Sequence, residues 1–377
     1  MDPLTIGFLS GVLLVLIIAN IAIVLLRKQR DYGIDPAVLE TFNSRIRAWW
    51  LLFGSLVAAF LLGNIATVLL FIAISFWSFQ EYITLTPTRP ADNTTLFGVF
   101  LGLPFQFLLV GVENEWFRSW FGIDSYLVFS ILIPAYAFLI IPAMIAMSGD
   151  SKFFLERIAK IQVGLLICVY SLSFAPALLT LELQKELPGE PTIVNSVANT
   201  DSPSSVLSGG VEDLVVENLK LEKKSNPDGT TTELQSPRLK QNNLNLRLLF
   251  FFVFIVQISD VLQYLWSLFG FRHIIASNIN STRTWEGVIG GTATTTLIGT
   301  SLWWFTPLLW WEAGIATFFV SIMGLAGSMT MSAIKRDRGV DDYGTLIEGH
   351  SGVLDRIDSL CFAAPVFYHV VWLCTHV

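Results

Sequence analysis

The sequence is poor in charged residues. Asp, Glu, Lys and Arg make up 14% of its 377 residues, whereas soluble domains carry about 25%. Hydrophobic residues make up 53% of the chain, and the mean hydropathy is positive. This composition excludes a large soluble globular protein and predicts an integral membrane protein.

The sequence also has few cysteines and no net positive charge. The three cysteines are Cys168, Cys361 and Cys374, and each falls in an apolar run. They have no metal-ligand spacing and suggest no disulfide framework, so we expect small buried side chains. The net charge of −7 argues against nucleic acid as a partner.

Long hydrophobic runs, by contrast, are plentiful. Residues 4–26 could cross a bilayer, and they lack a basic leading region and a small-residue cleavage site, so we predict a retained helix. Residues 48–77 are too long for one straight span, and Gly63-Asn64 is the predicted break. The other predicted spans are 96–112, 126–147, 155–181, 244–269, 285–309, 313–334 and 359–374. The predicted fold is an all-α polytopic bundle of about ten transmembrane helices.

The basic residues predict an orientation for this bundle. Lys and Arg are frequent in the polar segment 27–47, and such an excess near helix ends marks the cytoplasmic side. With about ten spans, the polar loops 270–284 and 335–358 fall on that same side. We therefore expect a multi-pass protein of the cell membrane with its polar site facing the cytoplasm.

Residues 182–243 interrupt the hydrophobic pattern. Ser, Thr, Asn, Pro, Gly, Glu and Lys dominate this segment, which cannot bury enough apolar surface to fold alone. We predict a disordered insert outside the cytoplasm. It separates N-terminal transmembrane helices, 1–181, from a C-terminal transmembrane domain, 244–377, that carries the polar site.

The segment 332–359 concentrates charge beside the membrane helices. It holds about ten charged residues, a costly arrangement unless they function or reach water. Lys335-Arg336 alone would suit a cytoplasmic helix stop, and Asp355 with Asp358 would suit a solvated helix cap. Together with glycines and a histidine they indicate a site for a metal ion and phosphate.

A second polar group lies upstream. Asp260 sits in an otherwise apolar helix, where an acid costs about 2.5–3.5 kcal/mol on insertion scales. Function is the default interpretation, and a helix-packing hydrogen bond is the alternative. Arg283-Thr284 precedes a helix start, where capping and free N–H groups attract phosphate. Simple membrane anchoring and capping is the alternative for this pair.

The order and spacing of these polar residues closely resemble the signature of phosphatidate cytidylyltransferases (CDP-diacylglycerol synthases). The resemblance covers about residues 250–359, whereas the N-terminal half matches only as hydrophobic helices. The residues that carry it are Asp260, Tyr264, Thr284, Trp285, Glu286, Gly287, Ser332, Lys335, Arg336, Asp342, Gly344, Gly349, His350, Gly352, Asp355, Arg356, Asp358 and Ser359.

The resemblance implies that CTP and phosphatidate react to give CDP-diacylglycerol and pyrophosphate, in phospholipid biosynthesis. It also implies a membrane-embedded polytopic fold, Mg²⁺ with or without a second cation, and a homodimer. The residue chemistry agrees, because two anions must meet and carboxylates with a divalent cation can neutralise them.

The resemblance also suggests roles for individual residues. Asp355 and Asp358 lie three apart on one helical face and are the first choices for metal ligands. Asp260, Asp341 and Asp342 are the other candidate ligands. The candidate catalytic residues are Asp342, His350, Asp355 and Asp358, with His350 as a polar contact or proton carrier. The candidate substrate-binding residues are Arg283, Thr284, Lys335, Arg336 and Arg356.

The chain departs from the family pattern at several positions. Ser328 stands where the family has an aspartate, and Asp341 stands where it has a lysine. Met331, Ser281 and Ser351 also differ from the family's usual residues. We predict a divergent subgroup in which Asp341 replaces the missing carboxylate.

Three other functions are left open by the sequence. One is a CTP-dependent enzyme acting on another lipid phosphate or on a polyprenol, such as a kinase, which would release CDP instead of pyrophosphate. A transporter would also explain an intramembrane acid such as Asp260, although the sequence shows no internal inverted repeat. The third is a catalytically silent protein that keeps the fold, which Ser328 and Asp341 would explain.

Overall fold

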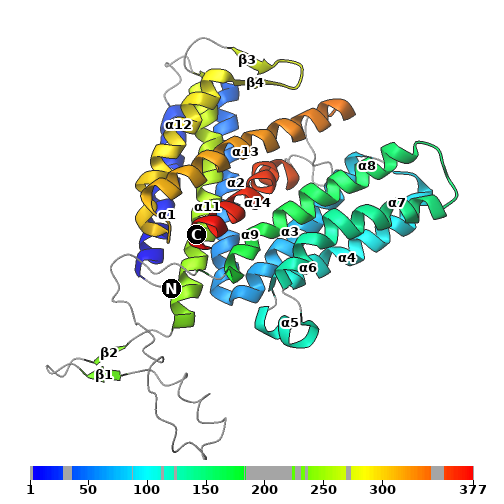
Figure 1. Ribbon diagram of the computed structural model, residues 1–377. Coiled ribbons are helices and arrows are strands. Elements are labelled where there is room, and N and C mark those ends of the chain that lie inside the picture. Colours follow the sequence, from blue (N-terminus) through cyan, green and yellow to red (C-terminus); the bar gives the residue numbers. More distant parts are fainter. Residues whose placement is uncertain are drawn as a thin grey trace, which may run out of the picture.

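The computed structural model describes residues 3–28, 36–86, 88–111, 114–122, 125–181, 183, 223–225, 231–233, 237–268, 273–340 and 352–376. These residues are overwhelmingly helical, as the hydrophobic pattern predicts (Figure 1). Four short strands form two separate antiparallel pairs. The predicted all-α fold class is confirmed.

The N-terminal half contains mostly long helices, two of which are continued through wider π-helical segments. Its elements are α1 (Pro3–Lys28), α2 (Pro36–Leu62), α3 (Asn64–Leu85), η2 (Pro90–Asp92), α4 (Asn93–Gly111), α5 (Asn114–Phe121), α6 (Ser125–Ile131), η3 (Leu132–Ala137), α7 (Phe138–Met147), α8 (Phe154–Leu165), η4 (Leu166–Ser171), α9 (Leu172–Ala177) and η5 (Leu178–Thr180).

The remaining elements include the two strand pairs and four long helices. They are β1 (Lys223–Ser225), β2 (Thr231–Glu233), α11 (Pro237–Leu268), β3 (Ile274–Ala276), β4 (Asn280–Thr284), α12 (Trp285–Ser301), η6 (Trp303–Phe305), α13 (Trp310–Arg338) and α14 (Leu354–His376). The sequence-based prediction missed β3 and β4, which form a hairpin inside the predicted loop 270–284.

Eight helical runs among the described residues are long and apolar enough to cross a membrane. The other two of the predicted ten spans correspond to shorter helical segments: the apolar stretch Trp49–Leu62 in α2 and the 17-residue α12. The helix break predicted at Gly63 is confirmed, since α2 ends at Leu62 and α3 begins at Asn64. Gly63 has a φ of 112°, which favours glycine because it lacks a Cβ.

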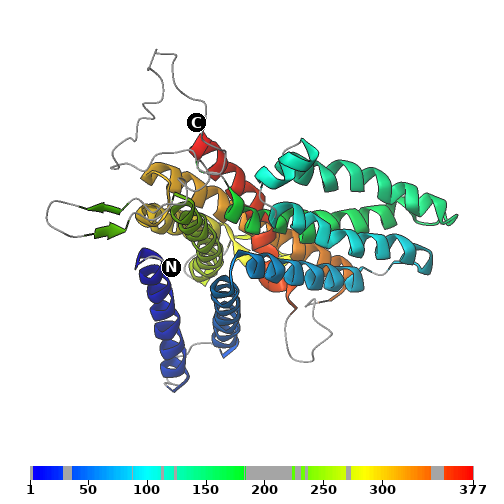
Figure 2. The same ribbon diagram turned by 90° about the horizontal axis from the view of Figure 1, so that it is seen from below.

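Helix α14 packs against α11 and α13 and also against α9 of the N-terminal half, whereas α12 packs against α11 and α13. Figure 2 shows α14 (red) between the α11–α13 group and the helices of the N-terminal half, with α1 (blue) at the edge. Phe250, Phe251 and Phe252 of α11 are fully buried in this core. The helices α11 and α12 approach so closely that a Cβ on Gly287 would lie 2.6 Å from the backbone oxygen of Gln263.

Contacts between distant segments identify the two ends of the bundle. At one end, Asn280 Nδ2 of the β3–β4 hairpin donates to Ser332 Oγ near the end of α13, over 3.2 Å. At the other end, Asn245 Nδ2 at the start of α11 donates to the backbone oxygens of Leu179 and Leu181, both over 2.9 Å. The hairpin and the start of α12 therefore lie at the opposite end from the start of α11.

A buried ion pair stabilises the N-terminal half at the hairpin end. Asp92 is fully buried and Arg157 is 3% exposed. Arg157 Nε donates to Asp92 Oδ2 over 2.9 Å, and Arg157 Nη1 donates to the backbone oxygen of Asp150 over 2.6 Å. This pair joins the start of α4 to α8 with most of its hydrogen-bonding groups satisfied, as a buried charge pair requires.

Candidate active site

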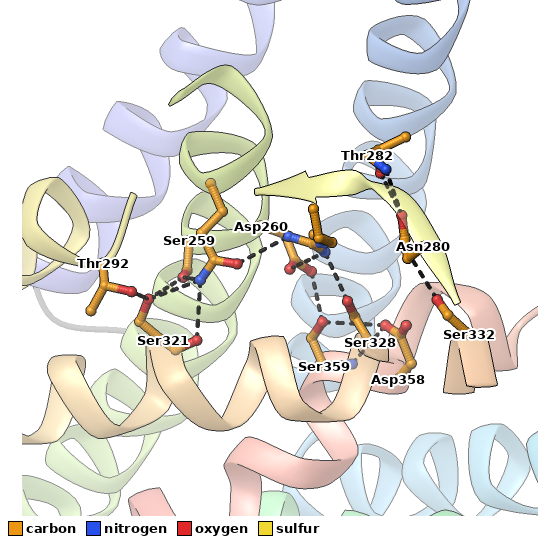
Figure 3. A network of polar contacts seen from close by, with 12 residues as sticks. Ser259, Asp260, Asn280, Thr282, Thr292, Ser321, Ser328, Ser332, Asp358 and Ser359 are labelled. Carbon is orange, nitrogen blue, oxygen red and sulfur yellow. Dashed lines mark hydrogen bonds and ion pairs between the residues drawn. The ribbon is translucent and has the colours of Figure 1, made fainter. Parts of the chain in front are cut away.

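A buried arginine joins three polar side chains at the hairpin end of the bundle. Arg283, the penultimate residue of β4, is 6% exposed. Its Nη2 donates to Asp260 Oδ1 on α11 over 3.2 Å and to Ser328 Oγ on α13 over 2.9 Å. Its Nη1 donates to Gln263 Oε1 on α11 over 3.0 Å. Figure 3 shows this group around Asp260 and Ser328.

Two carboxylates meet at a single hydroxyl in this group. Ser359 Oγ on α14 donates to Asp260 Oδ2 over 2.8 Å and lies 3.3 Å from Asp358 Oδ1. The backbone N–H of Ser359 donates to the same Asp358 oxygen over 2.6 Å. The helices α11 and α14, which are far apart in sequence, thus bring Asp260 and Asp358 together (Figure 3).

A row of buried polar groups holds Gln263 in place. Gln263 Nε2 donates to Ser321 Oγ over 3.1 Å and to Ser259 Oγ over 3.2 Å. Ser321 Oγ also lies 2.6 Å from Ser259 Oγ and 3.0 Å from Thr292 Oγ1. Figure 3 shows Ser259, Thr292 and Ser321 close together. Because these residues lie on α11, α12 and α13, they fix the Gln263 oxygen that accepts from Arg283.

Two other residues predicted to bind metal or phosphate, Lys335 and Asp355, pair with each other. Lys335 Nζ on α13 donates to Asp355 Oδ1 on α14 over 2.7 Å, and both side chains are largely buried. Arg336 Nε is 3.4 Å from the backbone oxygen of Ile279 in the hairpin turn. Arg356 is half-buried in the first turn of α14. These residues lie at the same end of the bundle as Arg283.

Thr284 caps α12, as the sequence predicts. Its Oγ1 accepts from the backbone N–H of Gly287 over 3.1 Å. The next residue, Trp285, donates its backbone N–H to the His273 oxygen over 3.0 Å, which closes the base of the hairpin. The hairpin and the cap together hold Arg283 beside α11 and α13. Thr284 is 4% exposed.

Three predicted site residues, Asp341, Asp342 and His350, lie outside the described residues. Within the described part of the chain, no group of three or more His, Cys, Asp or Glu side chains is placed to hold a metal ion. Asp260 and Asp358 nevertheless supply two carboxylates around one hydroxyl. Such hard oxygen donors suit Mg²⁺, which commonly takes one or two carboxylates and completes its shell with water and phosphate.

Two residues of this region were not singled out from the sequence. Gln263 had no signal of its own, because its role depends on contacts between helices. Glu81 on α3 had a signal, since it is an acid within a membrane-spanning helix, like Asp260. It is 4% exposed, and its carboxylate accepts two backbone hydrogen bonds at the start of α14.

Comparisons with known proteins agree with the resemblance seen in the sequence. The model of the cytidylyltransferase family matches residues 43–374. A protein of Escherichia coli strain K12, described as "Uncharacterized protein YnbB", is 28% identical over 339 residues, which cover 88% of each chain.

Relatives named for an activity match over shorter stretches. A phosphatidate cytidylyltransferase of Synechocystis is 39% identical over 99 residues, covering 26% of this chain and 34% of that protein. The chloroplastic phosphatidate cytidylyltransferase 5 of Arabidopsis thaliana is 42% identical over 101 residues, covering 26% of this chain and 25% of that protein. The chain thus spans about a third or less of the length of these two relatives.

Proposed function

The chain belongs to the cytidylyltransferase family, and from this premise we propose that it is a membrane phosphatidate cytidylyltransferase. It would convert CTP and phosphatidate into CDP-diacylglycerol and pyrophosphate. Relatives that carry this name support the proposal. So do the helices of membrane-spanning length, because phosphatidate is a membrane lipid.

The observation that supports the proposal most is the meeting of Asp260 and Asp358 at Ser359, beside Arg283. The reaction joins two anions, since a phosphate oxygen of the lipid attacks the α-phosphorus of CTP and pyrophosphate leaves. Such a reaction needs positive charge held in a fixed position around the phosphates. It needs no protein nucleophile, because the attacking oxygen is already ionised near neutral pH.

We propose that Asp260 and Asp358 hold Mg²⁺. Asp260 has Arg283 as a basic partner, whereas the hydrogen bonds of Asp358 come from the backbone and hydroxyl of Ser359. Asp358 thus supplies a negative charge that a cation could neutralise. When bound, Mg²⁺ would polarise phosphate oxygens and neutralise charge on the leaving group. Ser359 keeps the two carboxylates at one place.

The role of Arg283 in this proposal is mainly to position Asp260. Its guanidinium already donates to Asp260, Gln263 and Ser328. The planar fork of an arginine can hold several acceptors in one fixed geometry. Arg283 therefore orients Asp260 and adds a fixed positive charge next to the phosphates. Ser328 accepts from Arg283 where the family pattern has an aspartate, so one negative charge is absent there.

We propose that Lys335, Arg336 and Arg356 bind the phosphates of CTP or of the lipid. Lys335 pairs with Asp355 over 2.7 Å, so a phosphate would share or replace this carboxylate as the partner of Lys335. Asp355 would then become available to the cation. Asp341, Asp342 and His350 stay candidates from the sequence alone, and so does the homodimer.

The proposed site faces the cytoplasm, where CTP is available. The basic segment 27–47, which includes the end of α1 and the first turns of α2, supports this orientation because Lys and Arg are in excess near helix ends on the cytoplasmic side. The course of the helices leads from this segment to the hairpin end of the bundle, where Arg283 lies.

The test is to incubate the purified full-length protein with labelled CTP, Mg²⁺ and phosphatidate in detergent. We expect CDP-diacylglycerol and pyrophosphate as products, with little product from the Asp355→Ala variant. CDP and a newly phosphorylated lipid would identify a lipid kinase instead. If the folded protein makes no nucleotide-linked lipid, the proposed function is wrong.

A further inference from the structure

A carboxylate from the N-terminal half is buried against the start of the helix that carries Asp355 and Asp358. Glu81 lies near the end of α3 and is 4% exposed. Its Oε1 accepts from the backbone N–H of Val353 over 3.0 Å, and its Oε2 accepts from the backbone N–H of Leu354 over 2.9 Å. The two partners are 272 and 273 residues away in the sequence.

The start of α14 compensates the cost of burying this charge. The first N–H groups of a helix have no partner within the helix, and the helix dipole adds a partial positive charge there. Glu81 satisfies two of these groups with one carboxylate. A buried carboxylate without such partners would be strongly unfavourable, so α3 and α14 stabilise each other at this contact.

The contact also fixes where α14 begins. Asp355 directly follows Leu354, and Asp358 and Ser359 lie about one turn later in the same helix. A shift of the first turn would move these side chains together relative to Asp260 and Lys335. In enzymes, a displacement of about 1 Å can lower the rate about 100-fold.

We propose that Glu81 is a positioning residue for the carboxylates of α14, and through them for the divalent cation. This inference rests on the proposed function for its effect on catalysis. It extends the functional unit beyond the predicted C-terminal domain 244–377, because a residue of α3 sets the position of Asp355 and Asp358.

The contact has a second consequence for substrate binding. A helix start with free N–H groups commonly binds phosphate, but Glu81 already occupies the N–H groups of Val353 and Leu354. The start of α14 therefore binds the protein's own carboxylate rather than a phosphate. The proposed phosphate contacts at this end of α14 therefore come from side chains such as Lys335 and Arg356.

The test compares Glu81→Gln and Glu81→Ala with the wild-type protein, in full-length form. Glu156→Gln is the matched control, because Glu156 is half-exposed and forms its ion pair with Lys160 one turn along α8. Three quantities are measured: the dissociation constant of Mn²⁺ by electron paramagnetic resonance, hydrogen exchange at Val353 and Leu354, and kcat with CTP and phosphatidate.

We expect Glu81→Ala to weaken Mn²⁺ binding at least tenfold, to speed exchange at both amides and to lower kcat at least tenfold. Glu81→Gln keeps the shape and one acceptor oxygen, so its effects should be smaller but in the same direction. Glu156→Gln should change none of the three quantities more than twofold. A purely structural role would reduce the number of Mn²⁺ sites but not the affinity of those that stay folded.

Unchanged Mn²⁺ affinity in both Glu81 variants would overturn the inference, whatever happens to kcat. Mn²⁺ binding and hydrogen exchange do not depend on turnover. A wild-type protein without transferase activity would therefore contradict the proposed function, while these two measurements would still decide the role of Glu81.

Discussion

The pair formed by Arg283 and Asp260 offers a quantitative test of the site's electrostatics. The side chains are 7% and 16% exposed, and Arg283 Nη2 lies 3.2 Å from Asp260 Oδ1. At this distance the attraction is about 5 kcal/mol for an effective dielectric constant of about 20. Desolvation offsets much of it, so the net value must be measured by removing each partner alone and both together.

We expect Asp260→Ala and Arg283→Met each to lower the free energy of unfolding by about 3–5 kcal/mol, because each leaves a buried charge without its partner. The double variant should cost about 2–3 kcal/mol less than the sum of the two single changes, at the upper end of such couplings. The assay is denaturant unfolding of all four proteins in the same mixed micelles.

Glu156 and Lys160 supply the matched control for this cycle. Their atoms are closer, at 2.7 Å, but Glu156 is 50% exposed. The coupling between them should be only about 0.3–0.5 kcal/mol, since water screens an exposed pair on a helix. If the Arg283–Asp260 changes are additive within about 0.5 kcal/mol, the pair does not organise the site and the reasoning is refuted.

Four further predictions test other parts of the molecule. Arg157→Ala should destabilise the protein by about 3–5 kcal/mol in denaturant unfolding, because it leaves a buried carboxylate unpaired. Asp150→Asn should cost little at neutral pH. A hydrogen bond from Arg89 lowers the pKa of the Asp150 carboxyl. The resulting stabilisation is complete above the unfolded-state pKa of about 4 and is lost as the pH falls through the lowered pKa. On acidification, the unfolding free energy of Asp150→Asn should therefore fall less than that of the wild type. In intact cells, a membrane-impermeant thiol reagent should label Ser119→Cys on α5 but not Lys152→Cys, which shares the site's end of the bundle; the reverse pattern would contradict the proposed orientation. Asp341→Ala should lower the Mg²⁺-dependent rate of CDP-diacylglycerol formation, and full activity would show that Asp341 does not replace the carboxylate missing at position 328.

The fold followed largely from hydrophobic run lengths. Runs of membrane-spanning length predicted the helices, and Gly63-Asn64 marked the break between α2 and α3 because a straight span could not be that long. The hairpin of β3 and β4 was not predicted, since strands this short carry too few residues for an alternating pattern.

The site was predictable where one residue was costly in its own segment. Asp260 stood out as an acid in an apolar helix, and the same rule would have identified Glu81. The pairing of Lys335 with Asp355, and of Arg283 with Ser328, depends on contacts between helices. Sequence spacing along one helix contains no information on such contacts, so these partners could only be found in the structure.

The most direct test of the central claim is the rate of CDP-diacylglycerol formation by Asp358→Asn over a series of Mg²⁺ concentrations. The wild-type protein should be active and Mg²⁺-dependent. Asp358→Asn should be slower by about 100-fold or more, the scale of losing one well-placed electrostatic group. Asp337→Asn, a matched change at a residue with 70% side-chain exposure, should stay within about twofold of the wild type because water screens its charge. Wild-type rate and Mg²⁺ dependence in Asp358→Asn would contradict the account.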